Sequence, residues 1–150
     1  MHIYLGSDHG GFSLKAQLIS DLQIEGVLIT DCGTSSLAAT DYPDYALAVA
    51  KKVAEESGSF GILLCRSGEG MEMAANKVNG VRAALVWNEG VAMETRRDND
   101  ANILVLPADF ISRPLALACV RRFLVTSFSN LPRHMQRLEK LIAIERLQNA

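Results

Sequence analysis

The chain has 150 residues, of which 49% are hydrophobic, and a formal net charge of −2 at pH 7. This length and composition predict a single domain over residues 1–150 with a buried core. The small net charge argues against a nucleic-acid or anionic-membrane partner. No apolar run reaches the roughly 18 residues of a membrane span, and the N-terminus has no signal-like segment, so a cytoplasmic protein is expected.

Apolar runs and helically spaced apolar residues alternate along the chain. In chain order we expect a strand at His2–Gly6, a helix carrying Leu14 to Leu22, a strand at Val27–Thr30, a helix at Tyr45–Glu56, a strand at Gly61–Cys65 and a helix from Met71. A strand at Val81–Trp87, a helix at Val91–Arg97, a strand at Ile103–Leu106, a helix at Leu115–Thr126 and a last helix after Pro132 follow. This alternation predicts an α/β fold: a three-layer α/β/α sandwich with a Rossmann-like five-stranded parallel sheet, plus a C-terminal helix.

Polar residues follow the ends of the first three expected strands. In such folds ligands bind at the carboxyl ends of the strands, near a switch in strand order. The segment 98–102 precedes the fifth strand, so this argument does not place it at that edge. The residues expected at the edge are Asp8, His9, Asp41, Tyr42 and Cys65.

Cys65 ends an apolar run and is followed by a glycine-bearing turn over residues 66–70, before a helix-prone segment. A turn of this kind leaves backbone N–H groups free for an anion or a developing oxyanion, and it favours a thiolate at its rim. Alternatively, Cys65 only ends a buried strand and the glycines only turn the chain. The chain has two other cysteines, Cys32 and Cys119. The three have no CxxC spacing, which predicts free thiols and no zinc site.

A basic cluster opens the last expected helix. Arg133 and Arg137 are four residues apart and share a helix face, with His134 between them. Arginine suits bidentate binding of phosphate, and a histidine adds a donor. A solvated basic helix face explains the same spacing, and Arg96 and Arg97 are interpreted as surface residues.

Several short motifs follow one another along the chain in a specific order. They are S-D-H-G-G at 7–11, D-C-G-T at 31–34, T-D-Y-P-D-Y-A at 40–46, C-x-S-G-x-G-x-x-x-A-A-N-K at 65–77, G-x-R-A at 80–83, N-D-x-N at 99–102 and R-H-x-x-R at 133–137. With these motifs the chain resembles, over residues 2–146, the type B ribose-5-phosphate isomerases and the related galactose-6-phosphate and allose-6-phosphate isomerases.

The resemblance implies isomerisation of ribose 5-phosphate to ribulose 5-phosphate through a cis-enediolate, without a metal or organic cofactor. Two alternatives stay open. One is isomerisation of a six-carbon sugar phosphate, either allose 6-phosphate or galactose 6-phosphate. The other is a non-catalytic phosphosugar-binding homologue.

The resemblance also implies roles for individual residues. Cys65 takes the position of the proton-transfer base, and Ser67 is suited to orienting the base or the substrate oxygen. Backbone amides from Arg66 through Gly68 and Glu69 to Gly70 would stabilise the enediolate oxygen. The side chains implied in substrate binding are Asp8, His9, Asp41, Tyr42, Asn99, Arg133, His134 and Arg137.

Members of the resembled family are homodimers or tetramers with active sites shared between subunits. The resemblance therefore implies that Asn99 and the preceding Asp98 act in the neighbour's site. The family usually has a histidine at position 98, credited with opening the sugar ring. Three alternatives remain for ring opening here. Asp98 opens the ring with its pKa raised by burial, His9 opens it, or the ring opens in solution.

Other positions depart from the family pattern. Arg66 replaces a glycine, and its charge is expected to lower the pKa of Cys65 or to bind an anion. Glu72 is a minor alternative base, although a solvated glutamate in the first helical turn explains it better. Residues 106–110 replace a segment that is glycine-rich in the family and precedes an arginine that contacts the phosphate. Without a gap, Ile111 aligns with that arginine. Arg113 takes its role only if the register shifts.

Overall fold

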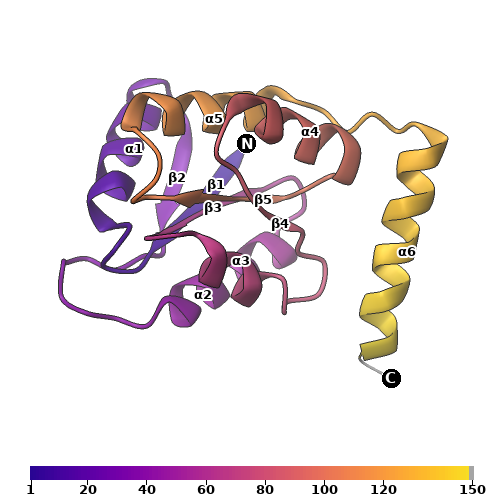
Figure 1. The fold of residues 1–150 in the computed structure, drawn as a ribbon, viewed down its shortest axis with the longest axis horizontal. Coiled ribbons are helices and arrows are strands. Elements are labelled where there is room, and N and C mark those ends of the chain that lie inside the picture. The colour runs from indigo at the N-terminus through magenta and orange to yellow at the C-terminus, as the bar shows by residue number, and fades with distance from the viewer. Residues whose placement is uncertain (149–150) are drawn as a thin grey trace.

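The computed structural model describes residues 1–148 and confirms the expected alternation of strands and helices (Figure 1). The strands are β1 His2–Ser7, β2 Leu28–Asp31, β3 Phe60–Cys65, β4 Ala83–Leu85 and β5 Ile103–Pro107. The helices are α1 Phe12–Ile24, α2 Tyr42–Glu55, α3 Glu69–Ala75, α4 Glu89–Asn99, α5 Arg113–Val125 and α6 Pro132–Gln148.

The five strands form one parallel sheet in the order β2-β1-β3-β5-β4. Helices α1, α4 and α5 cover one face, and α2 and α3 cover the other, so the expected three-layer α/β/α sandwich is confirmed (Figure 1). The chain winds outward from β1 to β2, then crosses to β3 on the other side of β1. The switch in strand order therefore lies between β1 and β3, where a ligand is expected at the carboxyl edge.

Alternating side chains of the central strands divide the buried residues between two cores. Ile62 and Leu64 of β3 point to the core under α1 and α5, which also contains Phe123. Leu63 and Cys65 point to the core under α2 and α3. The strand ending in Cys65 is therefore anchored on both faces, and its last side chain belongs to the α2/α3 face.

Several elements differ from their expected bounds by one to three residues, and for two of them the local reason is clear. Helix α2 begins at Tyr42 rather than Tyr45, because Pro43 lies in its first turn, where the missing N–H costs no helical hydrogen bond. Strand β4 keeps only Ala83–Leu85, the residues that pair with β5.

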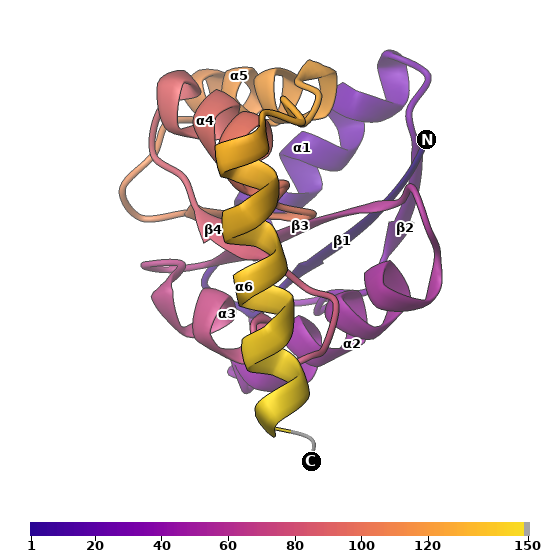
Figure 2. The same cartoon turned by 90° about the vertical axis from the view of Figure 1, so that its right-hand side faces the viewer.

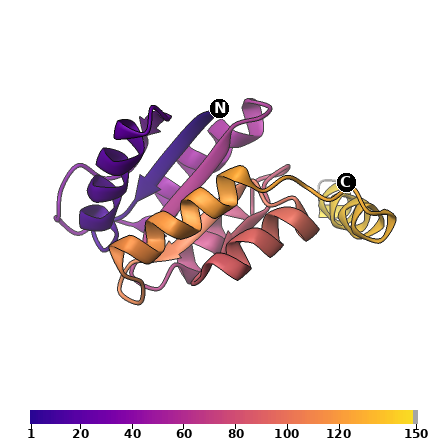
Figure 3. The same cartoon turned by 90° about the horizontal axis from the view of Figure 1, so that it is seen from above.

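Helix α6 stands away from the three layers. Figures 1 and 3 show it beyond the edge of the sheet, joined to α5 by an extended segment, and in Figure 2 it lies in front of the sheet. His134 is the buried residue of this helix, whereas Leu141 and Ile144 are 47% and 53% exposed. No helix within residues 1–148 is long and apolar enough to cross a membrane.

Candidate active site

Cys65 ends β3 at the carboxyl edge of the sheet, beside the end of β1. A pocket of about 250 Å³ opens there, next to the switch in strand order. Its lining residues come from the turn after β1, the start of α2 and the turn after β3; they are Asp8, His9, Tyr42, Cys65, Arg66, Ser67 and Gly70. The convergence expected at this edge is therefore present for these residues.

Cys65 is 6% exposed, and its thiol faces the turn that follows it. Gly68, with a φ of 81°, begins α3 in the left-handed region and donates its backbone N–H to Sγ at 3.2 Å. Burial raises the pKa of the thiol, and the charge of Asp8 adds to this, while the amides of Met71, Gly68 and Ser67 oppose it. The turn stabilises the thiolate as expected, but burial has the larger effect.

The turn after β1 is held by its own side chains. The carboxylate of Asp8 accepts from the backbone N–H groups of Gly10 at 2.9 Å and Gly11 at 3.2 Å. The backbone N–H of Thr40 donates to Nδ1 of His9 at 3.2 Å. A neutral His9 therefore carries its proton on Nε2, and this nitrogen is the donor available to a ligand.

Tyr42 forms the α2 side of the pocket. Its ring packs against Gly70, where an added Cβ would lie 2.7 Å from Cζ of the tyrosine. Ser67 is half-buried beside it, whereas Glu69 is exposed. Asp41 precedes α2 as its exposed N-cap residue and does not line the pocket.

The guanidinium of Arg66 pairs with Asp109 of the loop after β5. Nη1 donates to Oδ2 of Asp109 at 3.3 Å, and the side chain of Arg66 is 66% exposed. The groups that shift the pKa of Cys65 are its own burial, nearby amides and Asp8. The expectation that Arg66 lowers this pKa is wrong, because its charge is directed to Asp109.

A second cluster of expected site residues lies at the junction of α4 and α6. Arg97 donates to Asp98 at 2.7 Å, and Oδ1 of Asp98 lies 3.6 Å from Nδ1 of His134. Ser129 Oγ is 2.7 Å from the same nitrogen, and Nε of Arg133 donates to Nε2 of His134 at 3.2 Å. His134 is thus buried among protein groups rather than open to a ligand.

The two clusters lie at opposite edges of the sheet. Cys65 pairs with Pro107 at the carboxyl end of β5, whereas Gly61 pairs with Ile103 at its amino end. Four residues of strand separate these levels by roughly 13 Å. Since Asp98 and Asn99 precede Ile103, they belong to the amino edge.

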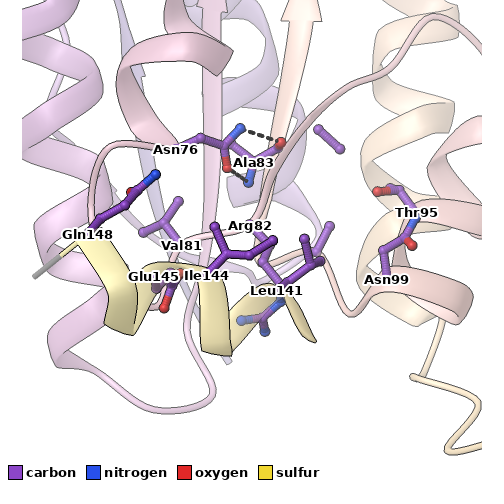
Figure 4. Close-up of a pocket in the computed structure, with 12 residues that line it drawn as sticks. Asn76, Val81, Arg82, Ala83, Thr95, Asn99, Leu141, Ile144, Glu145 and Gln148 are labelled. Atoms are coloured by element: carbon purple, nitrogen blue, oxygen red, sulfur yellow. Dashed lines mark hydrogen bonds between the residues drawn. The ribbon is translucent and has the colours of Figure 1, made fainter. Parts of the chain in front are cut away.

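Asn99 lines a larger pocket of about 440 Å³ between the body and α6. Figure 4 shows it facing this space from α4, with Leu141 and Ile144 on α6. Arg137 is exposed on α6. One chain therefore does not bring Asp98, Asn99 or the expected phosphate-binding arginines to Cys65.

Asp98 has a lowered pKa. The hydrogen bonds and charge of Arg97 hold it below its ordinary value, and His134 and Arg133 add to this. The alternative in which burial raises the pKa of Asp98 for ring opening is therefore wrong, because a neighbouring guanidinium outweighs the desolvation.

Two other candidate site residues, Arg113 and Glu72, have structural partners. Arg113 makes a bidentate ion pair with Asp21 of α1, at 2.6 and 3.0 Å, and not with the Cys65 pocket. Glu72 accepts from the backbone N–H of Leu85 at 3.0 Å. Both are therefore engaged in holding elements together.

Arg96 is buried, so its interpretation as a surface residue is wrong. Its guanidinium lies 4.8 Å from the Phe60 ring centroid and 5.6 Å from that of Phe123. Nη1 donates to Asp100 and to the carbonyl of Ala101, both at 2.7 Å. The two rings come from distant segments and no local pattern indicates them, whereas Asp100 is only four residues further along the chain.

Asp109 and Thr40 are further contacts of the site that sequence reasoning missed. Each contacts a residue that the sequence did indicate: Asp109 accepts from Arg66, and Thr40 donates to His9. Among residues 1–148, no group of three or more histidine, cysteine, aspartate or glutamate side chains is arranged to hold a metal ion.

A buried thiol, a histidine donor and a tyrosine at the switch point of a parallel sheet define a small-molecule site of the α/β class. Residues 3–141 match the Ribose/Galactose Isomerase family, and the chain belongs to that family. This finding confirms the resemblance seen in the motifs.

Individual relatives cover nearly the whole chain. The Mycolicibacterium paratuberculosis ribose-5-phosphate isomerase B is 40% identical, with 100% of this chain and 95% of that protein aligned. The Clostridium thermocellum ribose-5-phosphate isomerase B structure has a TM-score of 0.93 at 40% identity, covering 99% of both chains. The Mycoplasma genitalium enzyme, solved with bound ribulose-5-phosphate, has a TM-score of 0.92 at 39% identity, covering 97% of this chain and 96% of its own.

Proposed function

We propose that this protein interconverts ribose 5-phosphate and ribulose 5-phosphate, with Cys65 as the proton-transfer base. The observation that carries the proposal is a buried thiol at the switch point, whose sulfur accepts the N–H of Gly68. Relatives named ribose-5-phosphate isomerase B, similar over the full chain, support the same substrate pair.

The isomerisation needs one base and hydrogen-bond donors that stabilise the charged oxygen of the intermediate. The thiolate of Cys65 removes the proton on C2 of the opened aldose, and the C–H electron pair forms the C1–C2 double bond of a cis-enediolate, while charge moves to O1. The resulting thiol returns the proton to C1. The O2 proton moves to O1, so that O2 becomes the ketose carbonyl, and Ser67 and the turn amides stabilise the charged oxygen.

Ring opening of the cyclic sugar requires a donor for the ring oxygen. His9 fits this role, because Thr40 occupies Nδ1 and leaves the Nε2 proton for the pocket. Asp98 is a poor acid, since Arg97 keeps it ionised. Replacing His9 with Asn is expected to slow turnover of cyclic ribose 5-phosphate by about 100-fold, the size of one general-acid contribution.

A second copy of the chain completes the site. The exposed apolar side chains of α6, the exposed Arg137 on the same helix and the amino-edge position of Asp98 and Asn99 suit a homodimer, or a tetramer of such dimers, with sites shared between subunits. Mixing Cys65→Ala protein with Arg137→Ala protein is expected to restore activity to about one quarter of wild type, since half of the dimers then carry one intact site. No restoration would place both residues in one chain's site.

The direct test compares Cys65→Ala with the matched control Cys32→Ala. Losing the base is expected to lower kcat for ribose 5-phosphate by about 10² to 10⁴, whereas the control keeps wild-type turnover. Equal rates would remove Cys65 as the base. Allose 6-phosphate and galactose 6-phosphate, assayed alongside, are expected to give lower kcat/KM, and the reverse order would favour a six-carbon substrate.

A further inference from the structure

Two loops that depart from the family pattern meet at the rim of the Cys65 pocket. The backbone N–H of Ala108 donates to the carbonyl of Cys65 at 2.9 Å, and that of Asp109 donates to the carbonyl of Arg66 at 3.0 Å. The side chains of Arg66 and Asp109 then pair across the same junction at 3.3 Å. The β5–α5 loop and the turn after Cys65 are thus joined by their backbones and by one ion pair.

The stem of Arg66 also lies against the turn after β1. A Cβ added at Gly10 would be 2.6 Å from Cγ of Arg66, a distance that side chains do not adopt. The space for this arginine therefore depends on a glycine in the turn that carries Asp8 and His9. The guanidinium is directed by contacts from the turn after β1 and the loop after β5.

This pair is poorly suited to a purely stabilising role. Arg66 is 66% exposed and Asp109 is 43% exposed, and exposed ion pairs contribute little to stability. Asp109 takes one of the five N–H donors of the guanidinium, through Nη1. The planar group is therefore held in one orientation with donors left for a second anion.

The position of Arg66 suits the far end of a sugar phosphate. Among the described residues that line the Cys65 pocket, it is the only arginine or lysine. Cys65 is buried, at 6% exposed, whereas the exposed Arg66 side chain lies at the mouth of the pocket. A substrate whose C1 and C2 reach the thiol extends its other end, which carries the phosphate, toward the mouth.

We propose that Arg66 binds the substrate phosphate and that Asp109 is its positioning residue, orienting the guanidinium without touching substrate. This inference rests on the proposed function for the identity of the substrate. Within it, each site draws one phosphate-binding cation from the chain that supplies Cys65, in addition to those on the partner's α6.

The test is a double-mutant cycle over Arg66→Ala and Asp109→Ala, read as KM and kcat separately. Arg66→Ala is expected to raise KM about tenfold with kcat within about twofold, since a phosphate contact acts on binding. Asp109→Ala is expected to raise KM about threefold, and Asp109→Glu to restore it. In the Arg66→Ala background, Asp109→Ala is expected to add nothing, because it acts through Arg66.

The matched control breaks another exposed ion pair, that of Arg121 and Glu25, with Glu25→Ala. It is expected to leave KM unchanged. A full, additive effect of Asp109→Ala in the absence of Arg66 would overturn the positioning role. A fall in kcat with unchanged KM for Arg66→Ala would overturn the phosphate contact.

A calorimetric titration with inorganic phosphate separates this inference from the proposed function, because it needs no turnover. Affinity for phosphate is expected to fall about tenfold in Arg66→Ala and about threefold in Asp109→Ala. If wild type binds phosphate in this Arg66-dependent way but isomerises no sugar, the proposed function fails and this inference stands. If wild type isomerises ribose 5-phosphate and both variants bind phosphate normally, this inference fails alone.

Discussion

Replacing Gly68 with alanine tests whether the turn after Cys65 holds the thiol as the geometry indicates. Gly68 has a φ of +81°, and an added Cβ would lie 2.4 Å from Cδ1 of Leu85 and 3.4 Å from the backbone of Leu106. The left-handed conformation costs an alanine about 1 to 2 kcal/mol. Crowding of the Leu85 side chain adds about 1 to 3 kcal/mol. The free energy of unfolding is therefore expected to fall by about 2 to 5 kcal/mol.

Gly58→Ala is the matched control. Gly58 has nearly the same φ, +82°, but nothing lies within 4 Å of an added Cβ. Urea unfolding of both variants is expected to show a loss of about 1 to 2 kcal/mol for Gly58→Ala, which isolates the backbone term. Equal losses in the two variants would refute the close packing of the turn against Leu85.

The same pair of variants reports on the thiol. Moving the Gly68 amide away from Sγ removes a hydrogen bond to the thiolate, which is worth about 1.4 kcal/mol or a factor of about ten in its population. In a Cys32→Ala background, alkylation of Cys65 by iodoacetamide near pH 7 is expected to slow about tenfold in Gly68→Ala and to be unchanged in Gly58→Ala. An unchanged rate in Gly68→Ala would show that this amide does not stabilise the thiolate.

Three further predictions concern pH and buried charge. Because burial raises the pKa of Cys65, its thiolate accumulates only above the ordinary thiol range, so kcat/KM is expected to keep rising past pH 8.5; a plateau near neutrality would contradict this. Arg96→Ala is expected to lower the free energy of unfolding in urea by about 3 to 5 kcal/mol, because it leaves a cavity beside Phe60 and Phe123 and removes the donor to the buried Ala101 carbonyl, against less than about 1 kcal/mol for the exposed Arg121→Ala. The hydrogen bond from Tyr4 to Glu56 raises the pKa of Tyr4 to about 12 and lowers that of Glu56. The stability of wild type over Tyr4→Phe is therefore expected to be largest between about pH 5 and pH 10, and to shrink as pH falls through the Glu56 pKa or rises through that of Tyr4. A difference constant from pH 3 to 12 would show that the pair does not titrate with folding.

The strands and the pocket follow from signals that are local in sequence. Continuous apolar runs predict buried parallel strands, and the residues after β1 and β3 must then meet at one edge whatever the details of packing. This is why Asp8, His9 and Cys65 could be placed together from the sequence. The motif resemblance supplied their chemical roles, which alternation alone does not contain.

The remaining features depend on contacts between distant segments. Arg66 and Asp109 are 43 residues apart, and each alone resembles an ordinary surface charge. Arg96 has a charged side chain in a polar helix, and the Phe60 and Phe123 rings that cover it come from distant segments. For Asp98 the deciding group is Arg97, its neighbour in the sequence, whereas the sequence-based expectation considered only burial.

The division of the buried residues into two cores has a consequence for how this chain tolerates change. Cys65 and Met71 belong to the core under α2 and α3, so a volume change there is transmitted to the turn that carries the thiol. The core under α1 and α5, which contains Cys119 and Phe123, contributes no side chain to the described lining of the pocket. Substitutions in the core under α1 and α5 are expected to alter thermal stability with little effect on turnover. This core is therefore the one to redesign for an enzyme of higher thermal stability.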